Sequence, residues 1–264
     1  MPKSTNQPIN QPPYDLLYLS PHLDDAALSC GGQIFQHTQA GRRVMIVTVT
    51  AGEPALDATG HISDYARSLH DRWDLLADAV AGRRAEDVAA CAILGADFLH
   101  LDLADCIYRM HPETGQPFYV SDADLFGPVH AAEEGVVAWL AGQFEALPRA
   151  EQIVVPLGVG NHVDHQLTRQ AAERVWGVAG LIYYEDYPYA QKSGAVETIV
   201  GGQSGRWRSQ PIPLSPAALA AKIQSILAFR SQISTFWTDE ADLRAQVAGF
   251  AAQGGGEKNW TCLA

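Results

Sequence analysis

The chain has 264 residues, of which 47% are hydrophobic and 18% charged. This composition is typical of a folded globular protein and excludes wholesale disorder or a collagen-like fibre. The net charge is −12, from 18 basic and 30 acidic residues, and such a surface argues against nucleic-acid or membrane-surface binding as the main activity.

The chain opens with two expected strands joined by a helix. Residues 16–20 and 44–50 are apolar runs without alternation, which is typical of parallel strands buried on both faces. The segment 26–40 between them has helical spacing and ends before Gly41, so the three elements form a right-handed βαβ unit. This start predicts an α/β fold of the Rossmann-like kind, with a mostly parallel sheet, helices on both faces and C-terminal additions.

The remaining elements continue the alternation less regularly. We expect helices over 65–94 (interrupted near Gly82), 129–147, 163–176, 216–231 and 239–252. We expect strands over 98–103, 153–157 and 181–185, with weaker strand candidates at 196–200 and 207–210. Residues 104–129 show no sustained period, and a stretch of this length is more typical of a functional loop, with Tyr108, Arg109 and His111 as flap candidates.

The first candidate site follows the first strand. His22 and Asp25 stand three residues apart, and a helical turn would bring both side chains to one side, where they can bind one ion. Asp24 lies between them, and the carboxyl ends of parallel strands are where open α/β sheets bind ligands. The simpler interpretation is that Asp24 or Asp25 only caps the helix.

The second candidate site is the segment 161–165, Asn-His-Val-Asp-His, which follows the strand expected at 153–157. Here His162 and His165 again stand three residues apart at the carboxyl end of a strand. Either motif could arise by chance, but two at equivalent edges of one sheet indicate a metal site. The sequence has neither a Gly-x-Gly-x-x-Gly motif nor a Gly-x-Ser-x-Gly elbow, so neither a nucleotide cofactor nor a serine hydrolase is indicated.

The cysteines and the start of the chain favour a cytoplasmic location. Cys30, Cys91, Cys106 and Cys262 form no Cys-x-x-Cys pair, so we expect reduced thiols. The polar, proline-rich start lacks the apolar segment of a signal peptide, and no later run reaches membrane-spanning length. We expect residues 1–14 to form a flexible arm and residues 15–264 a single domain.

At the two histidine motifs the sequence resembles the PIG-L/LmbE-like family of zinc-dependent N-deacetylases. The family's two specific motifs are matched by SPHLDDAALSCGG and NHVDHQLTRQAA. Weaker similarity, over residues 15 to about 235, includes VTVTAGE, RRAE, LHLDLADC and KIQSILAFRSQIS. The chain departs from the family pattern at Leu23 and Val163, which replace prolines, and at Ala26, which replaces a glutamate.

The resemblance implies a role for each residue of the two motifs. It makes His22, Asp25 and His165 the ligands of one Zn²⁺ per chain, although another divalent metal would suit the same residues. It makes Asp24 the general base that activates water, and His162 the group that polarises the carbonyl or protonates the leaving amine. Two imidazoles and one carboxylate leave an open position, which is the ligand count of a catalytic zinc site.

The resemblance also implies the substrate. It makes Arg83 and Asp105 substrate-binding residues, in preference to a surface charge and a turn cap. Tyr184 is a further candidate, because it belongs to an aromatic run over 183–189 that leaves a strand at the same sheet edge and can offer ring faces to a sugar; the simpler interpretation of this run is strand packing. We expect a zinc-dependent hydrolase that removes an acetyl group from a small N-acetylated amino sugar of the N-acetylglucosamine type, or from its conjugate. The sequence leaves open a homo-oligomer. It also leaves open an amidase for another acylated amine or thiol conjugate, and a non-catalytic metal- or sugar-binding regulator.

Overall fold

The computed structural model describes residues 13–54, 56, 61–73, 79–203 and 205–263. Most of the expected N-terminal arm, residues 1–12, lies outside the described residues. The first strand already begins at Tyr14.

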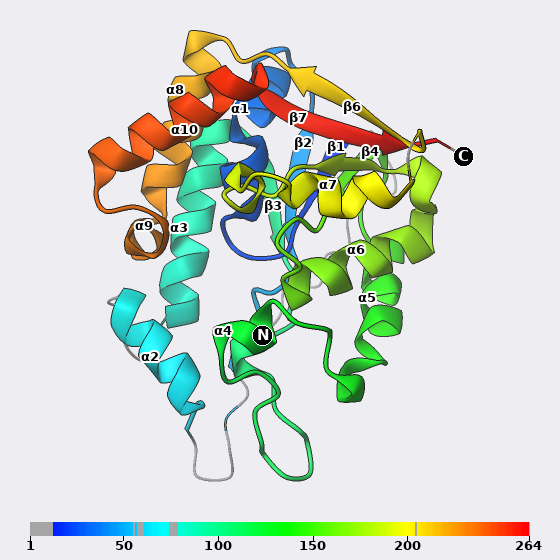
Figure 1. Cartoon of the computed structure of the whole chain (residues 1–264), viewed down its shortest axis with the longest axis vertical. Coiled ribbons are helices and arrows are strands. Elements are labelled where there is room, and N and C mark those ends of the chain that lie inside the picture. Colours follow the sequence, from blue (N-terminus) through cyan, green and yellow to red (C-terminus); the bar gives the residue numbers. More distant parts are fainter. Residues whose placement is uncertain (1–12, 55, 57–60, 74–78, 204, 264) are drawn as a thin grey trace.

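A seven-stranded sheet forms the centre of the molecule (Figure 1). Its order is β3-β2-β1-β4-β5-β7-β6, in which β1 to β5 pair in parallel and β7 pairs antiparallel with both β5 and β6. The strands are β1 (Tyr14–Ser20), β2 (Val44–Thr48), β3 (Asp97–His100), β4 (Ala150–Pro156), β5 (Ile182–Tyr184), β6 (Trp207–Ile212) and β7 (Glu257–Cys262). The predicted Rossmann-like, mostly parallel sheet is confirmed, with an antiparallel C-terminal addition.

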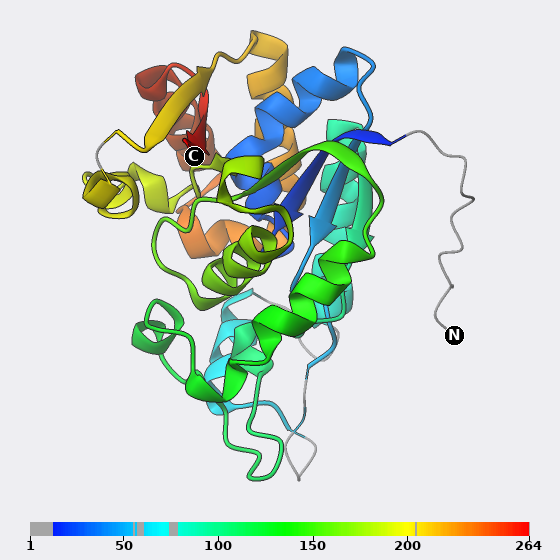
Figure 2. The same cartoon turned by 90° about the vertical axis from the view of Figure 1, so that its right-hand side faces the viewer.

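Helices lie on both sides of this sheet, as Figures 1 and 2 show. The α-helices are α1 (Asp25–Gln39), α2 (Asp64–Trp73), α3 (Ala79–Leu94), α4 (Asp122–Leu125), α5 (Val136–Glu145), α6 (Val163–Trp176), α7 (Ala195–Val200), α8 (Pro216–Ala228), α9 (Arg230–Phe236) and α10 (Glu240–Gly254). Among them, α1, α3 and α8 pack together, and α5 packs on α6. No helix in the described part of the chain is long and apolar enough to span a bilayer.

Strand β1 shows why helices cover both faces of the sheet. Successive side chains of a strand point to opposite faces. Leu17 and Leu19 join the core cluster that includes α5 and α6, whereas Leu16 and Tyr18 join the cluster that includes α1 and α3. Burial on both faces explains the uninterrupted apolar run in the sequence.

Three expected elements differ in the structure. Residues 196–200 form helix α7 rather than a strand, because Val196, Ile199 and Val200 pack on the core with helical spacing, and this burial outweighs the β-propensity of branched residues. The helix expected over 65–94 is divided earlier than near Gly82: α2 ends at Trp73, and α3 begins at Ala79 and continues through Gly82. The helix expected over 216–231 breaks at Phe229, between α8 and α9.

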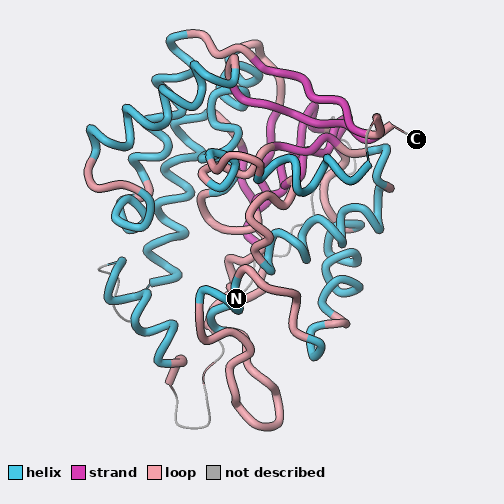
Figure 3. Tube along the Cα trace, in the orientation of Figure 1, coloured by secondary structure: helices cyan, strands magenta, loops and turns pink. Residues whose placement is uncertain are grey.

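The carboxyl ends of the parallel strands form the edge of the sheet at which a ligand is expected to bind. The chain order of the sheet reverses between β1 and β4, and a ligand in such a sheet binds beyond the carboxyl ends of the strands at this point. In Figure 3 the longest loops lie below the strands. Both histidine motifs leave the sheet here, one directly after β1 and the other after β4.

Candidate metal centre and its cavity

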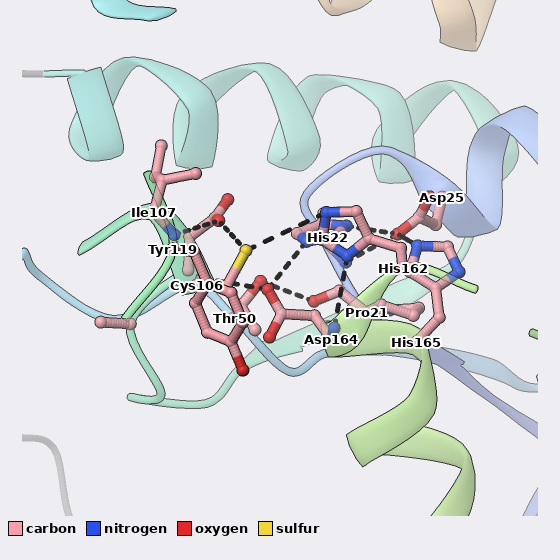
Figure 4. A network of polar contacts seen from close by, with 12 residues as sticks. Pro21, His22, Asp25, Thr50, Cys106, Ile107, Tyr119, His162, Asp164 and His165 are labelled. Atoms are coloured by element: carbon pink, nitrogen blue, oxygen red, sulfur yellow. Dashed lines mark hydrogen bonds and ion pairs between the residues drawn. The ribbon is translucent and has the colours of Figure 1, made fainter. Parts of the chain in front are cut away.

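The two histidine motifs meet around one oxygen atom. Asp25 Oδ2 lies 3.0 Å from His22 Nδ1 and 3.2 Å from His165 Nε2 (Figure 4). Ligand atoms about 2.0–2.2 Å from a tetrahedral zinc ion are about 3.4 Å apart, so the observed spacing is close to that of a shared cation. Asp25 is held in place because its Oδ2 also accepts the backbone N–H of His22 at 2.8 Å.

Each of the two imidazoles has a second carboxylate behind it. His22 Nε2 lies 3.1 Å from Asp164 Oδ2, and His165 Nδ1 lies 2.7 Å from Asp186 Oδ1. A ring nitrogen that donates to such a carboxylate carries the proton of the neutral imidazole, so the opposite nitrogen presents a lone pair.

In these tautomers both lone pairs face Asp25 Oδ2, which is itself an acceptor. His165 Nε2 is buried and, among the residues that the structure describes, has no hydrogen-bond partner. A cation at this point satisfies the two nitrogens and the carboxylate together. His22, Asp25 and His165 therefore fit a metal ion of the kind that imidazole and carboxylate bind.

The charges around this point favour a cation. Although burial lowers the pKa of His22, the carboxylates of Asp105, Asp164 and Asp25 raise it well above its usual value. Burial raises the pKa of Asp25, but the nearby His165 and His22 hold it well below its usual range. Positive charge is stabilised here, whether it is carried by protons or by a metal.

His162 also lies close to these ligands, since His22, His162 and His165 offer nitrogens within 4.8 Å of one another. Its Nδ1 accepts the backbone N–H of Asp164 at 3.3 Å and caps α6, which leaves the proton of the neutral ring on Nε2. Burial, with the positive charge of His22, lowers the pKa of His162 well below its usual value. The ring is therefore neutral, and we assign it as a hydrogen-bond donor rather than as a ligand of this ion.

Asp24 occupies the N-cap position of α1, but its side chain makes no capping hydrogen bond. The carboxylate is buried and lines a cavity next to the three proposed ligands. Burial and the charge of Asp25 raise the pKa of Asp24 to about 6, while Arg83 and His22 oppose this shift. A buried carboxyl group with such a pKa suits proton transfer near neutral pH.

Arg83 and Asp105 lie beside Asp24 in the same cavity. Arg83 is buried, with Nη2 4.0 Å from Asp24 Oδ1 and Nη1 3.4 Å from Asp105 Oδ2. Its guanidinium group also stacks over the ring of Trp73, 4.9 Å from the centroid. Asp105 in addition caps a short 3₁₀ turn by accepting the N–H of Ile107, so the capping interpretation and the cavity position both apply to it.

The cavity has a volume of about 250 Å³ and two chemically different ends. Its polar end contains His22, Asp24, Asp25, Arg83, Asp105 and His162. The rest of its wall, much of it apolar, comes from α2, α4, α9 and loop residues: Tyr65, Leu69, Arg72, Trp73, Ile107, Asp122, Leu125, Phe126, Tyr189, Gln232, Thr235 and Phe236. Aromatic walls of this kind can stack on the faces of a sugar ring or an aglycone.

The structure does not place Tyr184 in this cavity. Its side chain is fully buried in the core beside α1, and its hydroxyl donates to the carbonyl oxygen of Leu19 at 3.1 Å. The expectation that Tyr184 contacts substrate therefore finds no support, because the last residue of β5 points into the core. Tyr189, five residues later in the same aromatic run, lines the cavity instead.

Sequence reasoning missed the residues that support the ligands. Asp186 received no role, although it follows β5 at the same sheet edge as both motifs. Arg109 was only a flap candidate, yet it is buried and donates to Asp164 Oδ1 at 2.5 Å and to Glu133. Position after a strand could have indicated Asp186, but no spacing indicates the partners of Arg109.

Comparison with known proteins agrees with the motifs. A family model described as PIG-L, GlcNAc-PI de-N-acetylase, matches residues 17–176. A 2'-N-acetylparomamine deacetylase from Niallia circulans is 28% identical over 93% of this chain and 90% of its own length. A 1D-myo-inositol 2-acetamido-2-deoxy-alpha-D-glucopyranoside deacetylase from Mycobacterium sp. (strain KMS) is 33% identical over 62% of this chain and 52% of its own length.

Solved structures give the same result for the fold. The zinc-inhibited form of teicoplanin deacetylase Orf2 superposes with a TM-score of 0.76 and 30% identity, over 94% of this chain and 97% of that protein. The A40926 pseudoaglycone deacetylase Dbv21 gives a TM-score of 0.72 and 27% identity, over 96% of this chain and 98% of that protein. The described sheet and helices are therefore those of known deacetylases.

Proposed function

The chain belongs to the PIG-L family of de-N-acetylases, and on this premise we propose that it is a zinc-dependent N-deacetylase of an N-acetylated amino sugar or its conjugate. The observation that carries the proposal is the arrangement around Asp25 Oδ2, where two carboxylate-supported imidazoles converge. This arrangement adjoins Asp24 in a cavity. A metal-binding regulator would need the ligands but has no need of a buried carboxyl group with a raised pKa beside them.

The proposed metal ligands are His22, Asp25 and His165. When bound, the zinc ion supplies positive charge that polarises the amide carbonyl and makes water a better nucleophile. Two neutral imidazoles and one carboxylate leave a net positive site with room for substrate, as in other catalytic zinc sites.

Asp24 and His162 perform the remaining chemistry. The water oxygen adds to the amide carbon, and its proton passes to Asp24. The neutral His162 donates a hydrogen bond from Nε2 to the oxygen on which negative charge develops. Asp24 then returns the proton to the amine nitrogen as the C–N bond breaks, and the products are acetate and a free amine. A neutral His162 therefore fits polarisation of the carbonyl better than protonation of the amine.

The substrate class follows from the relatives and the cavity together. The curated relatives act on acetylparomamine and on an acetamido-glucopyranoside of inositol. Arg83 and Asp105 supply a donor and an acceptor for sugar hydroxyls, and Trp73 and Tyr189 supply ring faces. A cavity of about 250 Å³ suits one acetylated sugar ring, with the rest of a conjugate outside it.

The four cysteines are free, in support of a reducing, cytoplasmic setting.

Two variants test the proposal. Asp24→Asn should keep bound zinc but lose at least about 10²-fold in turnover, because general base catalysis is removed. His165→Ala should lose both zinc and turnover. Metal content by mass spectrometry and acetate release from N-acetylglucosamine derivatives measure the two properties. Because a zinc-inhibited form of one structural relative exists, the assay should cover a range of zinc concentrations.

Three results would contradict parts of the proposal. Near-full activity of Asp24→Asn would remove the base assignment. Release of an acid other than acetate would show that the enzyme removes an acyl group other than acetyl. A purified protein that contains no zinc, and shows no turnover when zinc is added, would exclude a zinc-dependent reaction.

A further inference from the structure

A second group of metal-ligating side chains lies behind His162. Cys106, His162 and Asp164 offer a sulfur, a nitrogen and an oxygen within 4.8 Å of one another, and all three residues are buried. Cys106 Sγ is 4.0 Å from His162 Nε2, and Figure 4 shows the sulfur directed toward this ring. None of these residues is a proposed ligand of the first ion.

The chemistry of this group is that of a zinc site. Thiolate, imidazole and carboxylate are the three ligand types that zinc binds in proteins. Bond lengths of about 2.3 Å to sulfur and about 2.1 Å to nitrogen place tetrahedral ligands about 3.6 Å apart, so Cys106 and His162 need to approach by only a few tenths of an ångström. Asp105 Oδ1, 3.5 Å from the sulfur, adds a further oxygen from a residue that lines the cavity.

The contacts of His162 point in the same direction. Its Nδ1 is used in capping α6, and within the described ranges the only hydrogen-bond contact of its Nε2 is the long one to Cys106 Sγ. His162 is buried, with 6% of its surface exposed. A buried nitrogen that faces a thiol at this distance is poorly satisfied by it.

We propose that Cys106, His162 and Asp164 bind a second Zn²⁺ ion that inhibits the enzyme. Coordination through Nε2 removes the proton that His162 would donate to the substrate oxygen. The Cys106 thiol loses its proton to solvent on binding. The inhibition rests on the proposed deacetylase function, whereas the metal site itself does not.

This second site is weaker than the first. Asp164 already accepts the N–H of Cys106 at 3.0 Å, and it pairs with Arg109 and His22. Coordination of Nε2 also shifts the ring proton of His162 to Nδ1, against the N–H of Asp164. These contacts must be displaced, so the second ion binds only after the first site is filled.

Cobalt provides a test that does not depend on activity. The full chain is loaded with one and then two equivalents of Co²⁺, and the near-ultraviolet absorption of thiolate-to-cobalt charge transfer is recorded. We expect this absorption only with the second equivalent. It should be absent in Cys106→Ala and retained in Cys91→Ala, a matched control whose buried thiol lies in the core between α1 and α3. A second equivalent without thiolate absorption would overturn the site.

A zinc titration of acetate release tests the consequence. Excess zinc should lower the turnover of the unmodified chain at least tenfold, and that of Cys106→Ala by less than twofold. Equal inhibition of both proteins would overturn the proposal. If no amide is hydrolysed at any zinc concentration, the deacetylase function fails, and the cobalt spectrum alone still decides the metal site.

Discussion

The two proposed histidine ligands are supported in different ways on the two sides of the site. On the β5 side, His165 contacts Asp186, whose other oxygen accepts the backbone N–H groups of Gly158 and Val159, both at 2.8 Å. This support consists of one carboxylate and the main chain that follows β4. It is built into the edge of the parallel sheet.

On the other side, the support of His22 comes through a charged network. Asp164 pairs with Arg109, which in turn pairs with Glu133, and Tyr119 donates its hydroxyl proton to Glu133. All four residues are buried. Arg109, Tyr119 and Glu133 come from the long segment between β3 and α5, part of which projects at the bottom of Figure 1.

This difference shows that the long segment between β3 and α5 is anchored to the site rather than free. Sequence analysis predicted a loop or flap over 104–129 because the stretch has no period. The structure fastens it to the site by Arg109, which also donates to the carbonyl oxygen of Ala104 at 3.0 Å. One ligand therefore depends on the sheet edge, and the other depends on buried ion pairs in a loop.

The largest expected effect is that of Arg109→Met on stability. The change leaves Asp164 and Glu133 as buried charges without their cation, and breaking a buried pair in this way costs about 3–5 kcal/mol. Urea unfolding measures the loss. The control is Arg244→Met, which breaks an exposed pair with Glu240 on α10 and should cost less than about 1 kcal/mol. Equal losses in the two variants would mean that the loop is not anchored by charge.

The next effect is that of Asp186→Asn on metal affinity. The amide has one acceptor oxygen where the carboxylate has two, so it cannot accept both backbone N–H groups and also the N–H of His165. The imidazole then loses its fixed tautomer. Removal of such a supporting carboxylate lowers metal affinity about 10–100-fold. Competition with a chelator measures this affinity. Asp102→Asn, at a side chain that is 95% exposed, is the control and should leave the affinity unchanged. If Asp186→Asn behaved like this control, the sheet-edge support would be irrelevant to the metal.

The contrast between the two sides also separates what the sequence could predict from what it could not. His22, Asp25 and His165 stand in short motifs after strands, so their convergence follows from the geometry of a parallel sheet. Arg109 contacts Glu133 and Asp164, which are separated from it along the chain by 24 and 55 positions, and only the folded chain brings them together.

The same reasoning applies to the fold. The parallel strands β1, β2 and β4 were predicted because burial on both faces leaves an unbroken apolar run. Strand β7 was missed, since its sequence Glu-Lys-Asn-Trp-Thr-Cys has mixed polarity and its pairing depends on distant β5 and β6. Tyr184 was misplaced because a strand's end does not reveal which way its last side chain points.

The smallest expected effect is that of Tyr119→Phe, which tests how far along the network the support of His22 extends. The change removes the hydroxyl that donates to Glu133 and accepts the N–H of His130 at 2.9 Å, but it leaves the pair of Arg109 and Asp164 intact. We expect a loss of about 1 kcal/mol in stability, as for a typical buried hydrogen bond, and less than about a twofold change in metal affinity.

The matched control for Tyr119→Phe lies on the β5 side. Tyr183 donates its hydroxyl to Glu173 at 3.1 Å, away from the proposed ligands, and Tyr183→Phe should cost a similar amount of stability. Urea unfolding and chelator competition on both variants give the comparison. A tenfold loss of metal affinity in Tyr119→Phe alone would show that the charged network acts on His22 as one unit, because a change at its far end would then reach His22 through four successive contacts.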